Sequence, residues 1–448
     1  MISNTDSIQI TSIRDNLTLI VDSFAHVSGC SIGAWFPYGS GHEVDGEYGL
    51  THFLEHMLFK GTGTHSASEL SRLIDRVGGY LNAFTERDTL CLHCTVPARY
   101  YDIAMQTMLE MLYDPVFRLD DFNKEKDIIR NEILSSDDDI EESGNDVFFS
   151  RMYPSHSFGR KIAGEVGEVA ELSIESLQLF HKKIILDGHC LITVAGACDA
   201  ESLAACINAK LQTIPILNQN ISQKSRLTDI TTSAKADKFR IIRKAPGSQT
   251  HFYTAIPLEK KEGSWNSTDF WAFSLISSAY GESMSSRLFM RLREDRGLCY
   301  NITSFASFYQ FASHWGINAS TSPEQFPEFA DAYKHESNLL YEKGLSDIEI
   351  HEAVTRMEGY LFLAADDSEY RMKRIARQYM FESRVDSIVE IQALFSVNTF
   401  YTADIINEYI RTYAKPADEN ILVYGKLSYF GCKAAAALGV NKERRYIR

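Results

Sequence analysis

Long hydrophobic runs and targeting segments are missing from this chain of 448 residues. No apolar run approaches the ~18 residues that a membrane-spanning helix needs, so we expect no membrane span. Residues 1–7 have neither the basic start and apolar stretch of a signal peptide nor the Arg-rich amphipathic pattern of an organellar transit peptide. We therefore expect a cytoplasmic protein, with the mitochondrial matrix as the alternative if a transit peptide was removed.

Cysteine is sparse, since eight residues are scattered over the whole chain. This low density excludes a disulfide framework and agrees with a reducing compartment. Cys91 and Cys94 have the spacing of half a zinc clamp, but residues three apart on a strand point to opposite faces. No second pair of cysteines follows them. We expect both cysteines, and His93 between them, to be structural.

Basic residues are outnumbered, with 45 Lys and Arg against 60 Asp and Glu and a formal net charge of -15. This balance argues against nucleic acid as the main partner, because phosphate binding needs basic patches. It is compatible with basic or neutral peptides. Hydrophobic residues make up 44% and charged residues 23% of the chain, as in ordinary globular proteins.

The pattern of elements repeats weakly between the two halves of the chain. In each half an apolar strand precedes a buried helix, and two strands and two long helices follow. This order predicts an α+β fold of two similar domains, each a mixed, mostly antiparallel sheet packed with helices. We expect the domains at 1–217 and 238–448. The polar segment 218–237, rich in Asn, Ser, Thr and Lys, is the expected linker.

The segment from Gly49 to Phe59 combines a buried helical pattern with polar groups. His52 and His56 are four residues apart and share one face of a helix, so both can bind one metal ion. Glu55 lies close enough to reach a water molecule on that ion. A satisfied pair of core histidines is the alternative for two histidines alone. The second half has no such group in the corresponding helix, so only the first half can hold the metal.

A third ligand has to come from elsewhere in the chain. Glu132 is the candidate, because it lies on an apolar face of the helix expected from Asp120 to Leu134. Glu125 lies on the same face two turns earlier and can hydrogen-bond to the site as an accessory acid. We expect that face to point inward. Two imidazoles and a carboxylate form a common catalytic zinc set that leaves one position for water.

The motif His52-x-x-Glu55-His56 and its surroundings resemble the inverted zinc-binding motif of the pitrilysin/insulysin family, the inverzincins. The similarity is to the half-length branch that includes mitochondrial processing peptidase β-subunits and bacterial processing-peptidase-like proteins. Glu132 matches the family's distal zinc ligand and Glu125 its accessory glutamate. The segment 78–85 resembles the edge strand that pairs with the substrate backbone.

The resemblance also assigns substrate contacts. Within the edge strand, Asn82 and Ala83 would bind the peptide, while Arg293 and Tyr300 match an Arg and a Tyr, seven apart, that contact the substrate near the scissile bond. The implied activity is a zinc endopeptidase for unfolded peptides, with one zinc ion per chain, Glu55 as the general base for a zinc-activated water, and Glu125 in support.

The family also implies a homodimer, or a heterodimer with a related chain, that encloses a chamber. Two alternatives remain open. One is a non-catalytic structural or assembly subunit of the same fold, and the other is a mitochondrial presequence-processing subunit.

Overall fold

The computed structural model describes residues 7–214, 233–260, 264–395 and 401–442, and it divides into two compact units. Each unit contains one six-stranded sheet with helices packed against it. Both sheets are mixed and mostly antiparallel. The predicted α+β class with two similar domains is therefore confirmed.

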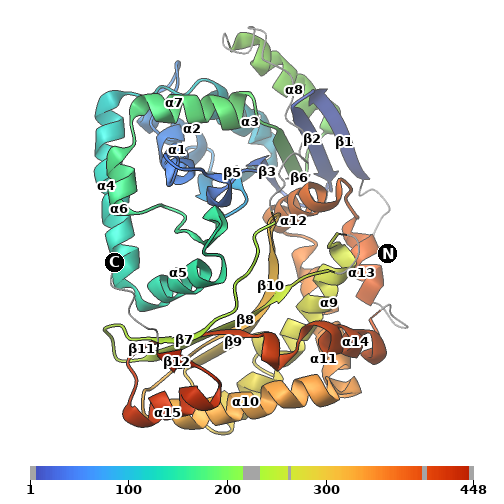
Figure 1. Ribbon diagram of the computed structural model, residues 1–448. Coiled ribbons are helices and arrows are strands. Elements are labelled where there is room, and N and C mark those ends of the chain that lie inside the picture. The colour runs from blue at the N-terminus through green and yellow to red at the C-terminus, as the bar shows by residue number, and fades with distance from the viewer. Residues whose placement is uncertain (1–6, 215–232, 261–263, 396–400, 443–448) are drawn as a thin grey trace. The chain divides into compact units, whose positions relative to one another are not determined.

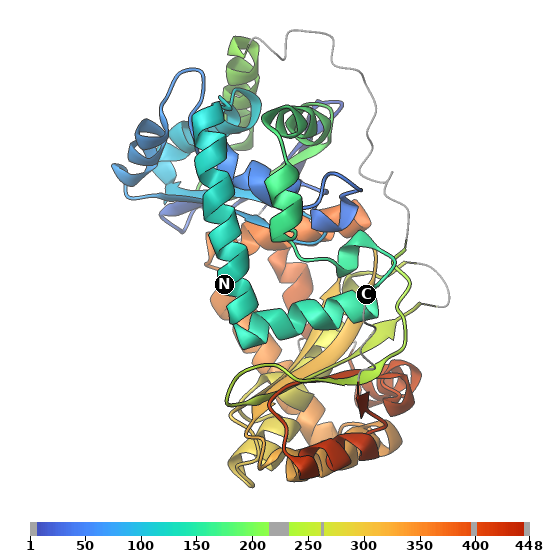
Figure 2. The same ribbon diagram turned by 60° about the vertical axis from the view of Figure 1, so that its left-hand side comes forward.

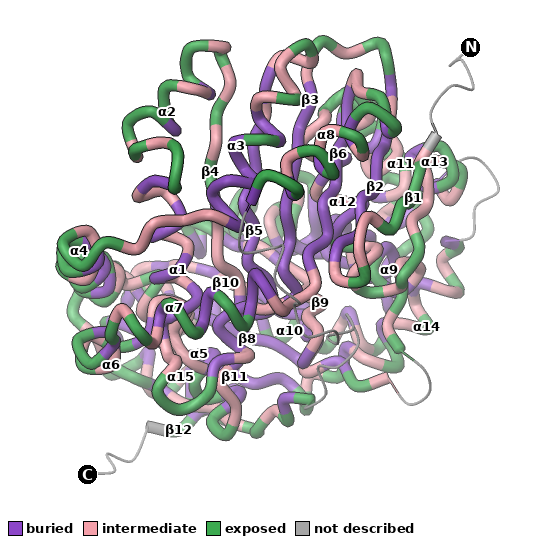
Figure 3. Tube along the Cα trace, turned by 90° about the horizontal axis from the view of Figure 1, so that it is seen from above, coloured by how far each residue is buried: buried purple, intermediate pink, exposed green. Residues whose placement is uncertain are grey.

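The sheet of the first unit has the strand order β1-β2-β6-β3-β5-β4. Its strands are β1 (Ser7–Arg14), β2 (Leu17–Ser23), β3 (Gly29–Phe36), β4 (Tyr80–Thr85), β5 (Leu90–Pro97) and β6 (Cys190–Gly196). Only β2 and β6 run parallel to each other. The central strands are rich in apolar residues on both faces, and Figure 3 shows β3, β5 and β6 buried along most of their length.

Helices cover both faces of this sheet. The larger core cluster lies on the face toward α1 (Leu50–Leu58), α3 (Tyr101–Tyr113) and α8 (Ala200–Thr213). The opposite face packs against α12 (Ser368–Glu382), drawn in orange beside β6 in Figure 1. Cys94 belongs to the first cluster and Cys91 to the second, so the two thiols point to opposite faces as predicted.

The remaining described α-helices from the first half of the chain, apart from α5 (Ile140–Met152), surround this core. They are α2 (Ala67–Asp75), α4 (Leu119–Asp138), α6 (Val166–Glu171) and α7 (Ile174–His181). In Figure 2, α4 is the long teal helix, with α6 in green beside it. The Lys126 ammonium of α4 donates to the carbonyl oxygens of Ala170 and Leu172 at the end of α6, which fixes this pair of helices.

The second unit repeats this layout with the strand order β12-β7-β11-β8-β10-β9. Its strands are β7 (Arg240–Arg243), β8 (Thr250–Leu258), β9 (Asn301–Phe308), β10 (Ser313–Thr321), β11 (Asn420–Gly425) and β12 (Asn441–Lys442). Strands β7 and β11 are parallel, as β2 and β6 are in the first sheet. Besides α12, the α-helices described in this half of the chain are α9 (Ser267–Ser277), α10 (Phe326–Lys343), α11 (Asp347–Ala364), α13 (Ile388–Phe395), α14 (Ala403–Tyr413) and α15 (Tyr429–Ala437).

The compact units differ from the two halves of the sequence. Residues 361–391, which include α12, belong to the first unit, and residues 135–159, which include α5 (Ile140–Met152), belong to the second. The expected boundaries, 1–217 and 238–448, place residues 135–159 in the first domain and residues 361–391 in the second. Long-range packing, which a linear pattern does not encode, determines this exchange. Most of the expected linker 218–237 lies outside the described residues.

None of the described helices is both long enough and apolar enough to cross a membrane. All eight cysteines are free thiols, and five of them are buried.

Candidate metal centre

The helix α1 carries the histidine motif, and its sequence accounts for both its start and its orientation. Gly49 precedes it at φ 88°, a left-handed conformation that favours glycine, and a Cβ there would lie 2.7 Å from the carbonyl oxygen of Ala163. The helix buries Leu50, Thr51, Phe53, Leu54, Met57 and Leu58. This packing leaves His52, Glu55 and His56 together on a half-buried face.

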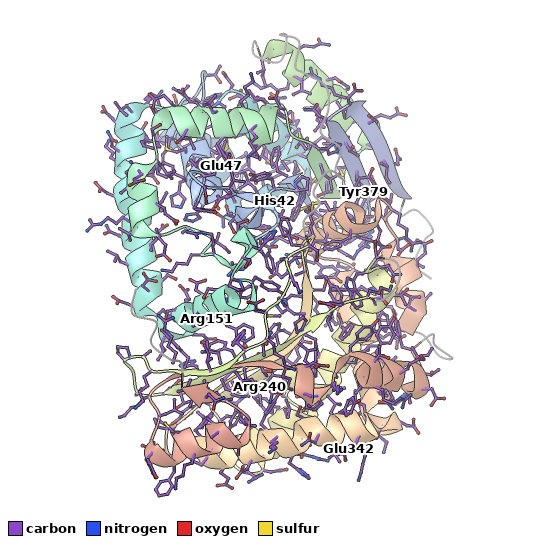
Figure 4. The ribbon with its side chains drawn as sticks, in the orientation of Figure 1. His42, Glu47, Arg151, Arg240, Glu342 and Tyr379 are labelled. Atoms are coloured by element: carbon purple, nitrogen blue, oxygen red, sulfur yellow. The ribbon has the colours of Figure 1, made fainter. Side chains whose placement is uncertain are left out.

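Glu43 holds the start of α1 in place. One carboxylate oxygen accepts the Gly49 N–H at 2.8 Å and the other accepts the Thr51 N–H at 2.7 Å. These are two of the N–H groups that have no partner within a helix. Burial raises the pKa of Glu43 to about 8, although its two backbone donors lower it. Figure 4 labels its neighbours His42 and Glu47, over the blue part of the ribbon that leads into α1.

The three predicted ligands come together in the first unit. Among the described residues, His52, His56 and Glu132 form the one group of three or more metal-binding side chains, with ligand atoms all within 4.8 Å of one another. The two imidazole rings are 4.6 Å apart between centroids. The nearer nitrogen of His56, Nε2, lies 3.5 Å from an oxygen of Glu132. The side chains thus converge from α1 and α4 on one point.

The protonation state of His52 suits metal binding. Burial, and next the neighbouring His56, lower the pKa of His52 from 6.5 to about 4, so its imidazole is neutral at pH 7. Its buried Nδ1 has no hydrogen-bond partner in the described part of the chain. A neutral imidazole is the form that binds a metal ion. Two imidazoles and one carboxylate therefore fit zinc.

His56 is oriented from behind by Glu125. The distance between His56 Nδ1 and Glu125 Oε2 is 3.0 Å, and the other carboxylate oxygen lies 2.5 Å from the ammonium of Lys60. With Nδ1 bonded to the carboxylate, Nε2 is the nitrogen left for a metal ion. The side chain of Glu125 is 5% exposed, as expected for a supporting acid.

The face of α4 points inward only in part, which corrects the expectation from sequence. Its buried side chains are Phe122, Glu125, Ile129 and Ile133, a stripe with spacings of three and four residues. Glu132 and Ile128 each precede a member of this stripe by one residue, or about 100° around the helix. Ile128 is accordingly exposed, and the Glu132 side chain is 48% exposed. Figure 3 shows α4 as a largely exposed helix.

Glu55 lies on α1 beside both histidines and contacts the sheet. One of its oxygens accepts a hydrogen bond of 2.5 Å from the Thr85 hydroxyl, at the end of β4. Burial raises the pKa of Glu55, whereas the bond from Thr85 and the nearby His56 lower it. A carboxyl group with a raised pKa that is held in one orientation is suited to accept and later release a proton.

The predicted peptide-binding segment is an edge strand. β4 is the last strand of its sheet, and its one strand neighbour is β5. Asn82 is exposed, and its side-chain oxygen accepts the N–H of Ala83 at 2.9 Å. An edge strand can add an extended peptide through its main chain. The roles of Asn82 and Ala83 remain predictions.

Arg293 and Tyr300 belong to the second unit. The guanidinium carbon of Arg293 lies 4.5 Å from the ring centroid of Phe289, and its side chain is 41% exposed. Tyr300 is 57% exposed. Both side chains are accessible to a ligand, and their predicted substrate contacts remain predictions.

Sequence reasoning missed three residues that support this centre: Glu43, Lys60 and Thr85. Lys60 had a usable signal, because it lies four residues after His56, so a helical turn continued past the end of α1 would place it beside that histidine. Glu43 and Thr85 had no such signal in the sequence. Glu43 contacts the start of α1 from a loop, and Thr85 contacts Glu55 from the end of a strand.

Comparison with known families agrees with this layout. The family model described as insulinase, peptidase family M16, matches residues 19–166. The model described as peptidase M16 inactive domain matches residues 171–357. The candidate metal centre falls within the first match.

Curated relatives extend over most of the chain. An uncharacterized zinc protease of Streptomyces coelicolor is 29% identical over 373 residues, which cover 83% of this chain and 80% of that protein. The uncharacterized zinc protease YmxG of Bacillus subtilis is 25% identical, and the match covers 84% of this chain and 89% of that protein.

Solved structures share the fold. A protease from Helicobacter pylori superimposes with a TM-score of 0.82 at 16% identity, covering 94% of this chain and 99% of the other. A peptidase M16 inactive domain from Pseudomonas fluorescens gives a TM-score of 0.79 at 15% identity, covering 94% and 98%.

Proposed function

This chain belongs to the insulinase family of peptidases, family M16, and we propose that it is a zinc-dependent endopeptidase that cleaves unfolded peptides or processing segments. The half-length bacterial branch of the family fits its length and its relatives. The names of those relatives, zinc proteases, support a peptidase that uses zinc.

The observation that carries the proposal is the convergence of His52, His56 and Glu132, with ligand atoms within 4.8 Å, beside the carboxylate of Glu55. We expect one zinc ion per chain at this position. When bound, zinc would lower the pKa of a water molecule towards ~7 and polarise the carbonyl of a peptide bond.

Side chains of this protein would carry out the proton transfers and hold the metal ligands in position. Glu55 would accept a proton from the attacking water and deliver it to the leaving amine, and the Thr85 hydroxyl would hold the carboxylate in place. Glu125 would fix the ring of His56 through Nδ1. His52, neutral at pH 7, is ready to bind metal without first releasing a proton.

The substrate would bind as an added strand along β4, through Asn82 and Ala83, with Arg293 and Tyr300 of the second unit as further contacts. Main-chain pairing would give a broad tolerance for the sequence of the substrate, since every peptide offers the same backbone groups. This binding mode would require an unfolded segment, because a folded protein does not present a free extended strand.

The test uses metal analysis and cleavage of an unstructured peptide. Wild-type protein is expected to hold one zinc ion per chain and to cleave, and Glu55→Gln is expected to hold the metal and lose cleavage. Glu175→Gln, an exposed change on α7, is the matched control and should retain both properties. Equal cleavage by wild type and Glu55→Gln, or a wild type without zinc, would refute the proposal.

Peptide cleavage also distinguishes the proposal from the two alternatives. A structural or assembly subunit would not cleave any peptide, whatever its metal content. A presequence-processing subunit would share the chemistry and differ in substrate, so a mass-spectrometric map of cleavage sites in a peptide library distinguishes the two peptidases.

The assembly and the compartment are also proposals. We propose a dimer, of identical or related chains, which analytical ultracentrifugation would test. We propose a cytoplasmic location, which the eight free thiols support and cell fractionation would check.

A further inference from the structure

Lys60 lies just beyond the end of α1 and reaches the acid behind a candidate metal ligand. Its Nζ is 2.5 Å from Glu125 Oε1, while the second oxygen of the same carboxylate is 3.0 Å from His56 Nδ1. The side chain of Lys60 is 28% exposed and that of Glu125 is 5% exposed. One buried carboxylate therefore connects an ammonium group to the imidazole.

The backbone of Lys60 is fixed as well. Its N–H donates to the carbonyl oxygen of Met57 at 3.2 Å, which continues the turn after α1. Its own carbonyl oxygen accepts from Arg118, the residue before α4, at 3.2 Å. Lys60 thus joins the end of α1 to α4 through both its main chain and its side chain. These are the two helices that carry His52, His56 and Glu132.

The charges explain why this link matters. A buried carboxylate without a partner is strongly unfavourable, and an ion pair with good geometry offsets much of that penalty. The ammonium leaves one carboxylate oxygen to accept a hydrogen bond from the imidazole. A bond from Nδ1–H to Glu125 fixes the tautomer of His56 and directs Nε2 toward Glu132.

We propose that Lys60 is a positioning residue of the metal centre, which holds Glu125 so that His56 keeps the orientation and tautomer needed to bind zinc. The inference rests on the proposed function, because it needs zinc as the bound ion. It concerns affinity for the metal and not the chemical step.

Zinc affinity, measured by competition with a chromophoric chelator, provides the test. Lys60→Met removes the ammonium and keeps most of the stem, and it should weaken zinc binding ~10–100-fold, the usual effect of losing a partner of a metal ligand. Lys60→Arg restores a cation and should bind within a few-fold of wild type. Lys124→Met, an exposed change next to Glu125 in the chain, is the control and should bind like wild type.

A double-mutant cycle shows whether Lys60 acts through Glu125. In a Glu125→Gln background, Lys60→Met should cause no further loss of zinc affinity. In the zinc-free protein, nitrogen NMR of labelled histidine should show a bonded Nδ1–H for His56 that is lost in Lys60→Met. A purely structural lysine would leave that signal unchanged and would weaken zinc binding equally in both backgrounds.

The outcomes separate this inference from the proposed function. A wild type that binds no zinc refutes the function itself. A wild type that binds zinc, with Lys60→Met binding equally well or losing affinity equally in both backgrounds, overturns the role of Lys60 alone. If Lys60→Met fails to fold, as judged by its thermal unfolding, Lys60→Gln replaces it with the same expected loss.

Discussion

Arg371 and Asp22 form a fully buried ion pair although 349 positions separate them in the chain. Arg371 Nη2 is 2.6 Å from Asp22 Oδ1 and Nε is 2.8 Å from Oδ2, a two-bond arrangement between α12 and β2. The side chains are 1% and 0% exposed, and the guanidinium lies 3.8 Å from the ring centroid of Phe24. The pair attaches a helix from the second half of the chain to the first sheet.

Breaking this pair should destabilise the first unit strongly. Asp22→Asn leaves Arg371 buried without its counter-charge, and we expect a loss of about 3–5 kcal/mol in the free energy of unfolding. The double variant Asp22→Asn with Arg371→Met should lose less than the sum of the single changes. Urea unfolding followed by circular dichroism measures this loss.

The control for this prediction lies on the same helix. Arg377 forms an exposed pair with Glu86 at 2.6 Å, and Arg377→Met should cost less than about 1 kcal/mol. A cost of Asp22→Asn as small as that of Arg377→Met would contradict the prediction.

Loss of the carboxylate ligand should release the metal. Glu132→Gln removes the one anionic member of the proposed set, and we expect zinc affinity to fall by more than the ~10–100-fold typical of a supporting partner. Asp127→Asn, an exposed change on the same helix, should bind zinc like wild type. Chelator competition at pH 7 measures both, and an unchanged affinity of Glu132→Gln would remove Glu132 from the ligand set.

The hydroxyl of Thr85 should matter for turnover and not for metal content. Thr85→Val deletes the donor that holds Glu55, so we expect kcat to fall ~10-fold, about the effect of one lost hydrogen bond to a charged group. Zinc content should stay at the wild-type value. Thr11→Val, on the exposed face of β1, is the matched control. Wild-type kcat in Thr85→Val would argue against the bond to Glu55 as a determinant of rate.

Protonation of His181 should account for part of the loss of folding stability at acid pH. It is buried, its Nε2–H donates to the Leu112 carbonyl oxygen at 2.7 Å, and burial lowers its pKa from 6.5 to about 4. Between pH 6.5 and 4 the unfolded chain therefore binds a proton that the folded chain does not. The contribution of His181 to the free energy of unfolding is therefore fully present above pH 6.5. It decreases as the pH drops toward 4, by ~3 kcal/mol at most.

The stability difference between wild type and His181→Gln isolates this effect, because all other groups titrate in both proteins. Wild type should lose its advantage over His181→Gln as the pH falls from 7 to 4. His335→Gln, at an exposed position, should show a constant difference. A constant difference for His181→Gln as well would show that His181 is not the source.

The local elements of this protein could be read from sequence because short-range patterns specify them. The helical spacing around His52 and His56 predicted α1, and the helix expected from Asp120 to Leu134 is found as α4. The weak repeat of strands and helices predicted two similar sheets. Each of these predictions depends on residues that are close in sequence or on the order of strands and helices along the chain.

The exchange of α5 and α12 between the units had no such signal. Nothing in a linear pattern says which of two similar sheets each helix covers. Asp22 also read as an ordinary strand residue, because its partner lies in a helix from the other half of the chain.

The sequence by itself determined the candidate chemistry, because the spacing of His52, Glu55 and His56 sets their shared face on a helix. The tertiary structure alone decided how that chemistry is supported: that Glu132 meets the histidines at the exposed side of α4, that Thr85 reaches Glu55, and that Lys60 pairs with Glu125. Helix periodicity is a local property of the chain, whereas the meeting of side chains from different elements depends on how the whole unit packs.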